Sequence, residues 1–473
     1  MSKIHHRSYD KYQAYYARID DALEGQDAMR ANAAQYLRKM TGMQSSEFEA
    51  YARGGSYYPT AERTLRGMTG LCLTHAPTID LPPRLEPFRQ SATYQGNPLS
   101  VFIENVLAAV LSKGRYLALL DYPPDGNTVT SLPYLSCFNA ESIMDWKYSL
   151  VGGKEQVTYL RLREDDDDLA DEGIEQHLVC TLEPFHVDPQ NEDMFEDNEK
   201  LGIVYKVRRY HVKGTDETMV GEVATPQVNG SYLKEIPMVC FSPSNLTLDI
   251  EKPPLLDIVD LNIAHWQNSV DLEHTVHLAA QPTFVRIGAS RVDEKNNTIG
   301  PGAVWDLPTG GDAKVLEITG EGARVTREAM VDKEARMASL GATFITDGKV
   351  RNETATTSQI RNRSANSLLY SSLEMVEAGL TKLLQWAADW VQPNSTVTVE
   401  FSRDLVSATA DPAMVGALLK AWQSGAISHE TFIDNMRRGE VVASDRSYEQ
   451  EKDAIESEGG DINIIPVMQT QDV

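Results

Sequence analysis

The order of apolar and polar positions divides the first quarter of the chain into helices followed by a strand. Residues 9–75 carry apolar side chains at helical spacing and predict several helices. Residues 97–114 predict one more helix, because Asn97 suits its N-cap and Gly114 suits its end. The apolar run at 116–122 that follows is short and uninterrupted, which predicts a buried strand.

The middle of the chain, residues 130–245, is rich in short β-forming segments. Two acidic runs, at 163–175 and 188–200, interrupt it and are typical of solvated loops. A cation site in these runs is the alternative, although the spacing lacks the glycine and the terminal glutamate of a calcium loop.

Residues 253–282 predict a long helix bracketed by prolines. Short strands and turns are expected over 283–318, and a second helix near 321–340. Apolar side chains recur every three or four positions along the first of these helices: Leu255, Val259, Ile263, Trp266 and Val270.

A still longer helix is predicted from about 355 to 391, roughly 55 Å in length, before Pro393. Its apolar positions alternate in steps of four and three, which predicts a narrow seam facing a neighbouring helix. Such a rod is natural in a large assembly, so we expect other copies of the chain to stabilise it. The seam consists of Leu369, Leu373, Val376, Leu380, Leu383, Ala387 and Trp390.

Net charge restricts the kinds of partner. The 473 residues include 44 Lys and Arg against 69 Asp and Glu, a net charge of −25. This balance argues against wrapping nucleic acid, which needs clustered cations, but it is compatible with a protein past which DNA slides. No signal peptide or membrane-spanning stretch is visible. The four cysteines lie far apart, which predicts reduced, buried thiols.

Motifs for catalysis are not found in the sequence. There is no GxGxxG after a strand, no phosphate-binding GxxxxGK[ST] and no GxSxG elbow. His265, His274 and His277 share a helix without an HExxH pattern, which favours surface or interface histidines over a metal site. We therefore expect a structural protein with no cofactor, no metal and no catalytic residue.

The polar segment 345–365 departs from the acidic average of the chain. It contains Lys349, Arg351, Arg361 and Arg363 against Asp347 and Glu353, a net charge of +2. Read alone, it is an exposed connection between two helices.

In their order along the chain, several motifs resemble the portal proteins of tailed bacteriophages and, within that class, the DUF4055 group. The resemblance covers most of residues 10–455. The motifs are GRYLALLDYP (114–123), PYLSCFNAESIMDW (133–146), the helix and strand at 253–288, GPGAVWDLP (300–308), EARMASLGA (334–342), TATTSQIR (354–361) and GAISHETF (425–432).

The resemblance implies an α+β portal fold with wing, stem, clip and a small crown. Its parts would be a wing at 1–252, helical at first and strand-rich from about 115; a stem helix at 253–282; a clip at 283–319; a second stem helix at 320–342; a tunnel loop at 343–354; a long wing helix at 355–391; and a crown with an acidic tail at 392–473.

The resemblance also implies a function. Portal proteins form a ring, typically of twelve subunits, at one capsid vertex, where DNA enters and leaves. Expected partners are double-stranded DNA passing without sequence preference, the large terminase subunit, a head-to-tail adaptor or tail proteins, and the major capsid protein. No membrane is involved. The protein would be made in the host bacterial cytoplasm and reside in the virion.

Site residues follow from the resemblance. The seam residues would pack helices, and the cations of the tunnel loop would form a collar around DNA. The DNA-facing candidates are Lys349, Arg351 and Asn352, with Arg361 and Arg363 as secondary candidates, and the docking candidates in the clip are Arg291, Lys295 and Trp305. The alternatives are an intracellular metal- or nucleotide-dependent enzyme and a structural adaptor unrelated to portals.

Overall fold

The computed structural model has an α+β fold divided into two compact units, Met1–Phe401 and Ser402–Val473. It describes residues 5–121, 132–184, 202–279, 284–287, 304–307, 310, 321–345, 367–403 and 412–438.

The helices expected in the first quarter of the chain are present. The helix α6 (Leu99–Lys113) ends at Gly114, which adopts the left-handed conformation with φ 75°. The expected cap at Asn97 is wrong, because Pro98 occupies the N-cap position and no side chain caps the helix. The preceding helices are α1 (Tyr9–Glu24), α2 (Gln26–Ala31), α3 (Ala33–Tyr36), α4 (Ser45–Gly54) and α5 (Thr60–Cys72), followed by β1 (Thr78–Asp80) and the 3-10 turn η1 (Glu86–Arg89).

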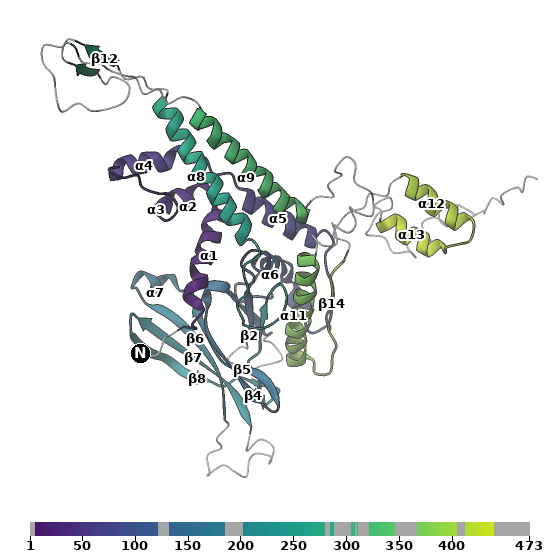
Figure 1. Cartoon of the computed structure of the whole chain (residues 1–473). Coiled ribbons are helices and arrows are strands. Elements are labelled where there is room, and N and C mark those ends of the chain that lie inside the picture. The colour runs from purple at the N-terminus through teal and green to yellow at the C-terminus, as the bar shows by residue number, and fades with distance from the viewer. Residues whose placement is uncertain are drawn as a thin grey trace, which may run out of the picture. The chain divides into compact units, whose positions relative to one another are not determined.

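Two larger antiparallel sheets form most of the strand-rich region, beside a two-stranded pair of short strands, β9 (Gln227–Val228) and β10 (Ser231–Tyr232) (Figure 1). The buried strand predicted after α6 is β2 (Tyr116–Asp121), between β11 (Met238–Phe241) and β3 (Tyr134–Asn139). The second sheet has the order β4-β5-β6-β7-β8, so each strand pairs with its neighbour in sequence. Its strands are β4 (Ile143–Val151), β5 (Lys154–Glu164), β6 (Glu175–Pro184), β7 (Ile203–Lys213) and β8 (Asp216–Ala224). The other short elements around them are η2 (Ala140–Ser142) and α7 (Asp167–Asp171).

One shared core joins the two sheets. Buried side chains of β2, β3 and β11 pack against one face of β4–β7. The first acidic run is not only loop, since it contains the short helix α7, whose N-terminus is capped by Asp166. Burial raises the pKa of the thiols of Cys72 and Cys180 to about 12, and all four cysteines are free.

The seam of the long helix is buried inside its own chain. This helix, α11 (Ser367–Val391), contacts β11, β2, α5, α6 and β14 (Thr398–Glu400). A Cβ placed on Gly379 would lie 2.9 Å from Cδ1 of Phe241, so α11 rests directly on β11. All seven seam residues are at most 2% exposed: Leu369, Leu373, Val376, Leu380, Leu383, Ala387 and Trp390.

The expected neighbouring helix is only part of what covers the seam. Helices α6 and α5 contact α11 as expected, but β11, β2 and β14 of the same chain contact it too, so the seam is buried without a second copy. The spacing of apolar residues reports the width of the buried stripe and carries no information on what covers it. β14 also pairs with β1, which places residues 392–401 in the first unit although we expected them in the C-terminal region.

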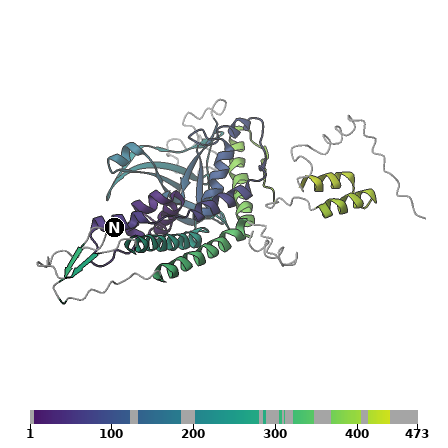
Figure 2. The same cartoon turned by 90° about the horizontal axis from the view of Figure 1, so that it is seen from above.

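Two long helices, α8 (Leu256–Ala279) and α9 (Glu321–Ile345), lie side by side in both views (Figure 1, Figure 2). Between them in sequence come β12 (Phe284–Ile287) and β13 (Val304–Leu307), which pair in parallel. Among the helices described, none is both long and apolar enough to cross a membrane.

The second unit contains a helical hairpin, α12 (Pro412–Gln423) and α13 (His429–Arg438). The predicted cap is confirmed, because Oγ of Ser428 accepts a hydrogen bond from the backbone N–H of Thr431 at 3.0 Å. Phe432, Ile433 and Met436 form its small core against Trp422 and its neighbours.

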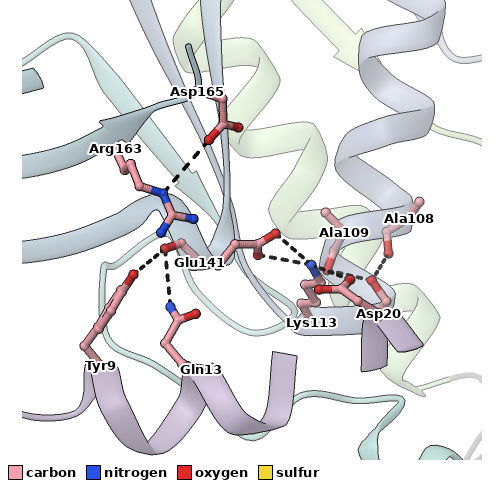
Figure 3. Close-up of polar contacts among 10 residues, drawn as sticks. Tyr9, Gln13, Asp20, Ala108, Ala109, Lys113, Glu141, Arg163 and Asp165 are labelled. Atoms are coloured by element: carbon pink, nitrogen blue, oxygen red, sulfur yellow. Dashed lines mark hydrogen bonds and ion pairs between the residues drawn. The ribbon is translucent and has the colours of Figure 1, made fainter. Parts of the chain in front are cut away.

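A lysine at the end of α6 ties three elements of the first unit together (Figure 3). Nζ of Lys113 lies 2.7 Å from Oδ1 of Asp20 in α1 and 3.0 Å from both carboxylate oxygens of Glu141 in η2. The hydroxyl of Tyr9 donates to the backbone carbonyl of Glu141. Lys113 is only 11% exposed, so this bridge helps to fix α1 against α6 and the start of the second sheet.

A second polar network lies on the face of the second sheet opposite the shared core. Nε of Arg161 donates to Nδ1 of the buried His177 at 3.0 Å, and Nε2 of His177 lies 3.0 Å from Glu175. The other arm of Arg161 bonds Glu217 at 2.6 Å. Because Nδ1 accepts a hydrogen bond, the proton of the neutral imidazole sits on Nε2. Burial lowers the pKa of His177.

We expect His177 to make the protein less stable in mild acid. The unfolded histidine has a pKa of about 6.5 and takes up a proton that the folded state resists, so the free energy of unfolding falls as the pH drops through that value. The melting temperature of His177→Gln should therefore decrease less between pH 8 and pH 5.5 than that of the wild type. His211→Gln on the neighbouring strand is the control; an unchanged pH slope in His177→Gln would contradict the assignment.

Candidate functional site

The helix α8 has one buried apolar stripe, as its sequence predicts. Leu255 just before it and Val259, Ile263, Trp266 and Val270 within it are at most 6% exposed. The helices α1, α4 and α5 supply the surfaces that cover this stripe. About 1.5 Å of rise per residue makes the 24-residue helix about 36 Å long, and the N-terminal segment bonds it from Asn262 to Asp271.

A buried asparagine fixes α8 to α5. Oδ1 of Asn262, which is fully buried, accepts hydrogen bonds from the backbone N–H groups of Thr60 and Ala61, each at 3.1 Å. Its Nδ2 donates to the carbonyl of Tyr58 at 2.8 Å. The N-cap of α5 is Pro59, whose side chain has no acceptor, so Asn262 satisfies the first N–H groups of that helix from another element.

The chain that follows α4 touches α8 through its backbone. Oγ of Ser269 accepts a hydrogen bond from the backbone N–H of Ser56 at 3.0 Å. A Cβ on Gly55 would lie 2.9 Å from both Cα and N of Val270. Only a residue without a side chain fits at this crossing, so Gly55 sets how closely α4 and α8 approach.

The helix α9 is fixed along one side only. Nε2 of His265, which is 4% exposed, lies 3.0 Å from Oε1 of Glu334 and links α8 to α9. Met337 is fully buried, and Gly341 packs closely on Thr64 of α5. Most other positions of α9 are exposed, including Val325 at 55% and Val331 at 56%. A 25-residue helix with so little cover presents a large surface to a partner.

The two helices differ in charge. α8 contains Asp257, Asp260, Asp271 and Glu273 and no lysine or arginine. α9 contains four cations and four anions. Within the described ranges, Arg327, Lys333 and Arg336 of α9 form no hydrogen bond or ion pair through their side chains, so their charges are available to another molecule.

Most site residues proposed from the sequence cannot be placed. Seven of these candidates lie outside the described residues: Lys349, Arg351, Asn352, Arg361, Arg363, Arg291 and Lys295. The eighth, Trp305, belongs to β13, but its side chain is outside the described part as well. In the described part of the chain, no group of three or more His, Cys, Asp or Glu side chains is arranged to hold a metal ion.

Sequence reasoning missed three contacts of this helix pair: the cap from Asn262, the close approach at Gly55 and the hydrogen bond between His265 and Glu334. Each joins residues more than 60 positions apart. The only available signal was for His265, which the sequence favoured as a surface or interface histidine, and it does lie at the interface with α9.

Comparisons with known proteins single out the same region. A family model described as a domain of unknown function, DUF4055, matches residues 254–391, which include α8, β12, β13, α9 and α11. This match supports the resemblance to that group over this segment. No curated protein matches the chain.

Solved structures give only a weak similarity. A chain in the neck of an empty GTA particle is 12% identical, covers 85% of this chain and 95% of its own length, and has a TM-score of 0.35. A chain from the virion of a native gene transfer agent particle is 13% identical, covers 85% and 96%, and has the same TM-score. A TM-score of 0.35 is too low for these structures to indicate a function for this chain.

Proposed function

We propose that this chain is a non-enzymatic structural subunit of a phage virion, and specifically the portal protein, which forms a ring at one capsid vertex. The observation that carries the proposal is the surface of α9. One face is fixed to α8 and α5, while the remaining surface is exposed, within the segment that the DUF4055 model matches. A ring of copies would cover this surface and enclose a channel for DNA packaging and ejection.

In this proposal α8 and α9 are the stem helices. Residues 283–319 are the clip, where Arg291, Lys295 and Trp305 face the terminase and later the adaptor or tail. Residues 1–252 and α11 are the wing, which meets the major capsid protein, and the C-terminal hairpin belongs to a small crown. No cofactor takes part.

The tunnel loop is the proposed contact with DNA. Because α9 continues to Ile345, the loop begins at 346 rather than at the expected 343, and it ends at 354. Lys349 and Arg351 of each copy, with Asn352 beside them, would form a collar of cations and amides that attracts phosphates regardless of sequence. The acidic remainder of the chain would repel DNA and keep it from sticking, although salt screens this field beyond about 8–10 Å.

Electron microscopy of the purified protein in negative stain tests the ring. The expected result is a ring with a central opening, of about twelve subunits as the portal resemblance implies. A protein that stays monomeric over a range of salt and protein concentrations would overturn the proposal, and an oligomer without a central channel would favour the structural adaptor.

Replacement of both Lys349 and Arg351 by alanine tests the collar. We expect rings of normal appearance but reduced packaging or retention of DNA, because the loop loses its two central cations. The readout is the length and amount of DNA in particles that carry the variant. The matched control is Arg38→Ala with Lys39→Ala, two exposed cations outside the tunnel loop; normal DNA content in the loop variant would rule out the collar.

A further inference from the structure

A groove of about 480 Å³ lies between α1, α3 and α8. Its floor and walls include small side chains, Ala14 and Ala17 of α1 and Ala264 of α8, and small residues allow another helix to approach closely. An ion pair between Arg18 and Asp260 (2.8 Å) lies at its edge.

The groove and α9 are on opposite sides of α8. A helix turns about 100° per residue, so Asp260, Ile263 and Gln267 of the groove point about 140–160° away from His265, which faces α9. Figure 1 also shows α8 between α9 on one side and α2–α4 on the other. If α9 of one copy entered the groove of the next copy, the same contact could therefore repeat from copy to copy and form a continuous layer of helices.

The outward side of α9 suits this groove. Asp332 and Arg336 lie about 160° from Glu334, the residue that faces α8. Both are exposed, and within the described ranges the side chain of Arg336 has no polar partner. The carboxylate that lines the groove is Asp260, whose side chain is 45% exposed although it pairs with Arg18, so it can also meet a cation such as Arg336.

Ring symmetry selects which part of α9 reaches the groove. In a closed ring whose axis runs along the helix pair, all copies lie at the same height. α8 and α9 run antiparallel, with His265 level with Glu334. Arg336 is then level with Ile263, and Asp332 with Gln267, which are two residues that line the groove.

We infer that the groove between α1, α3 and α8 receives the outward side of α9 around Asp332 and Arg336 from a second copy of this chain. The contact is head-to-tail, and its repetition closes the ring; the inference thus rests on the proposed function and names the interface that builds it. Arg336 lies next to Asp260 of the adjacent copy, and the alanines of the groove cover part of the exposed surface of α9.

The test uses the full-length chain with two introduced cysteines, Ala264→Cys and Asp332→Cys, and a short bismaleimide cross-linker. Three of the four native cysteines are buried, and burial raises the pKa of the thiol of Cys137, the fourth, so the new thiols react first. We expect a ladder of covalent oligomers in a denaturing gel. The control is the pair Ala264→Cys and Val325→Cys, because Val325 lies about 15 Å along α9 from the position that is level with Ala264.

The outcomes separate this interface from the proposed function. Rings in negative stain without the ladder would overturn the interface and leave the portal proposal standing, whereas the absence of both rings and ladder would overturn both. A ladder from the Val325 pair alone would contradict the alignment that places Arg336 level with Ile263 and Asp332 level with Gln267. As a second measurement, Arg336→Glu should raise the protein concentration needed for ring formation about tenfold while Arg336→Lys should not, and equal assembly of all three proteins would contradict the charge contact.

Discussion

Replacement of Leu380 by aspartate should prevent the single chain from folding, before any assembly takes place. Leu380 is fully buried in the middle of α11, which packs on β11, β2 and α6 of the same chain. No cation is among the seam residues around it. A carboxylate there would lose its hydration without gaining a partner, which costs several kcal/mol. Folded domains are stable by only about 5–15 kcal/mol in total.

A milder substitution makes this effect measurable. Leu380→Ala leaves a cavity between α11 and the sheet and should lower the free energy of unfolding by about 2–5 kcal/mol. Chemical denaturation followed by circular dichroism measures the loss. We expect no folded protein from Leu380→Asp under conditions in which the alanine variant is still folded.

Glu374→Ala is the matched control, because Glu374 lies on the exposed side of the same helix. Its free energy of unfolding should stay within about 0.5 kcal/mol of the wild type. If Leu380→Asp instead gave a folded monomer that failed only to form oligomers, the seam would be an interface between copies, and the packing of α11 described above would be wrong.

The sequence predicted most helices and strands because their signals are local. Apolar spacing identified the buried stripe of α8 from Leu255 to Val270 and all seven seam residues of α11. Gly114 and Ser428 marked helix ends through backbone and capping preferences that act over a few residues. The cap at Asn97 failed because the helix begins one residue later, so Pro98 is the N-cap and its side chain offers no acceptor.

The partners of these elements were not predictable from the same signals. A heptad-like stripe looks the same whether a helix or a sheet covers it, so α11 was expected to face a neighbouring helix and other copies. The contacts between Asn262 and α5, and between His265 and Glu334, join segments far apart in sequence. A pattern in one segment contains no information on such pairs.

The candidate site illustrates the same limit. The cations at 345–365 stood out because net charge is a local sum, and they remain predictions. The exposed surface of α9 did not stand out, since its alanines and mixed charges form no strong periodic pattern. This surface can be recognised only from the structure, in which α8 and α5 cover one side of α9 and leave the rest exposed.

Gly55→Ala should have the second large effect, by displacing the N-terminal helices from α8. The new Cβ would lie 2.9 Å from both Cα and N of Val270, distances that real Cβ atoms do not show. Because the obstacle is backbone, no side-chain rotation relieves it, and α4 or α8 must move. The hydrogen bond from Ser56 to Ser269 next to this crossing would be strained as well. We expect a loss of about 1–3 kcal/mol, measured by chemical denaturation.

The adjacent residue provides a matched control. A Cβ on Gly54 would lie 3.7 Å from Cβ of Glu273, an ordinary contact, and Gly54 is the last residue of α4. Gly54→Ala should therefore be neutral or more stable by up to about 1 kcal/mol, because alanine restricts the unfolded chain. Equal stability of the two variants would mean that α4 and α8 do not cross this closely. The difference between them thus measures how firmly α8 is held. The ring proposed above needs such an anchor, because there α8 would carry α9 into the groove of a neighbouring copy.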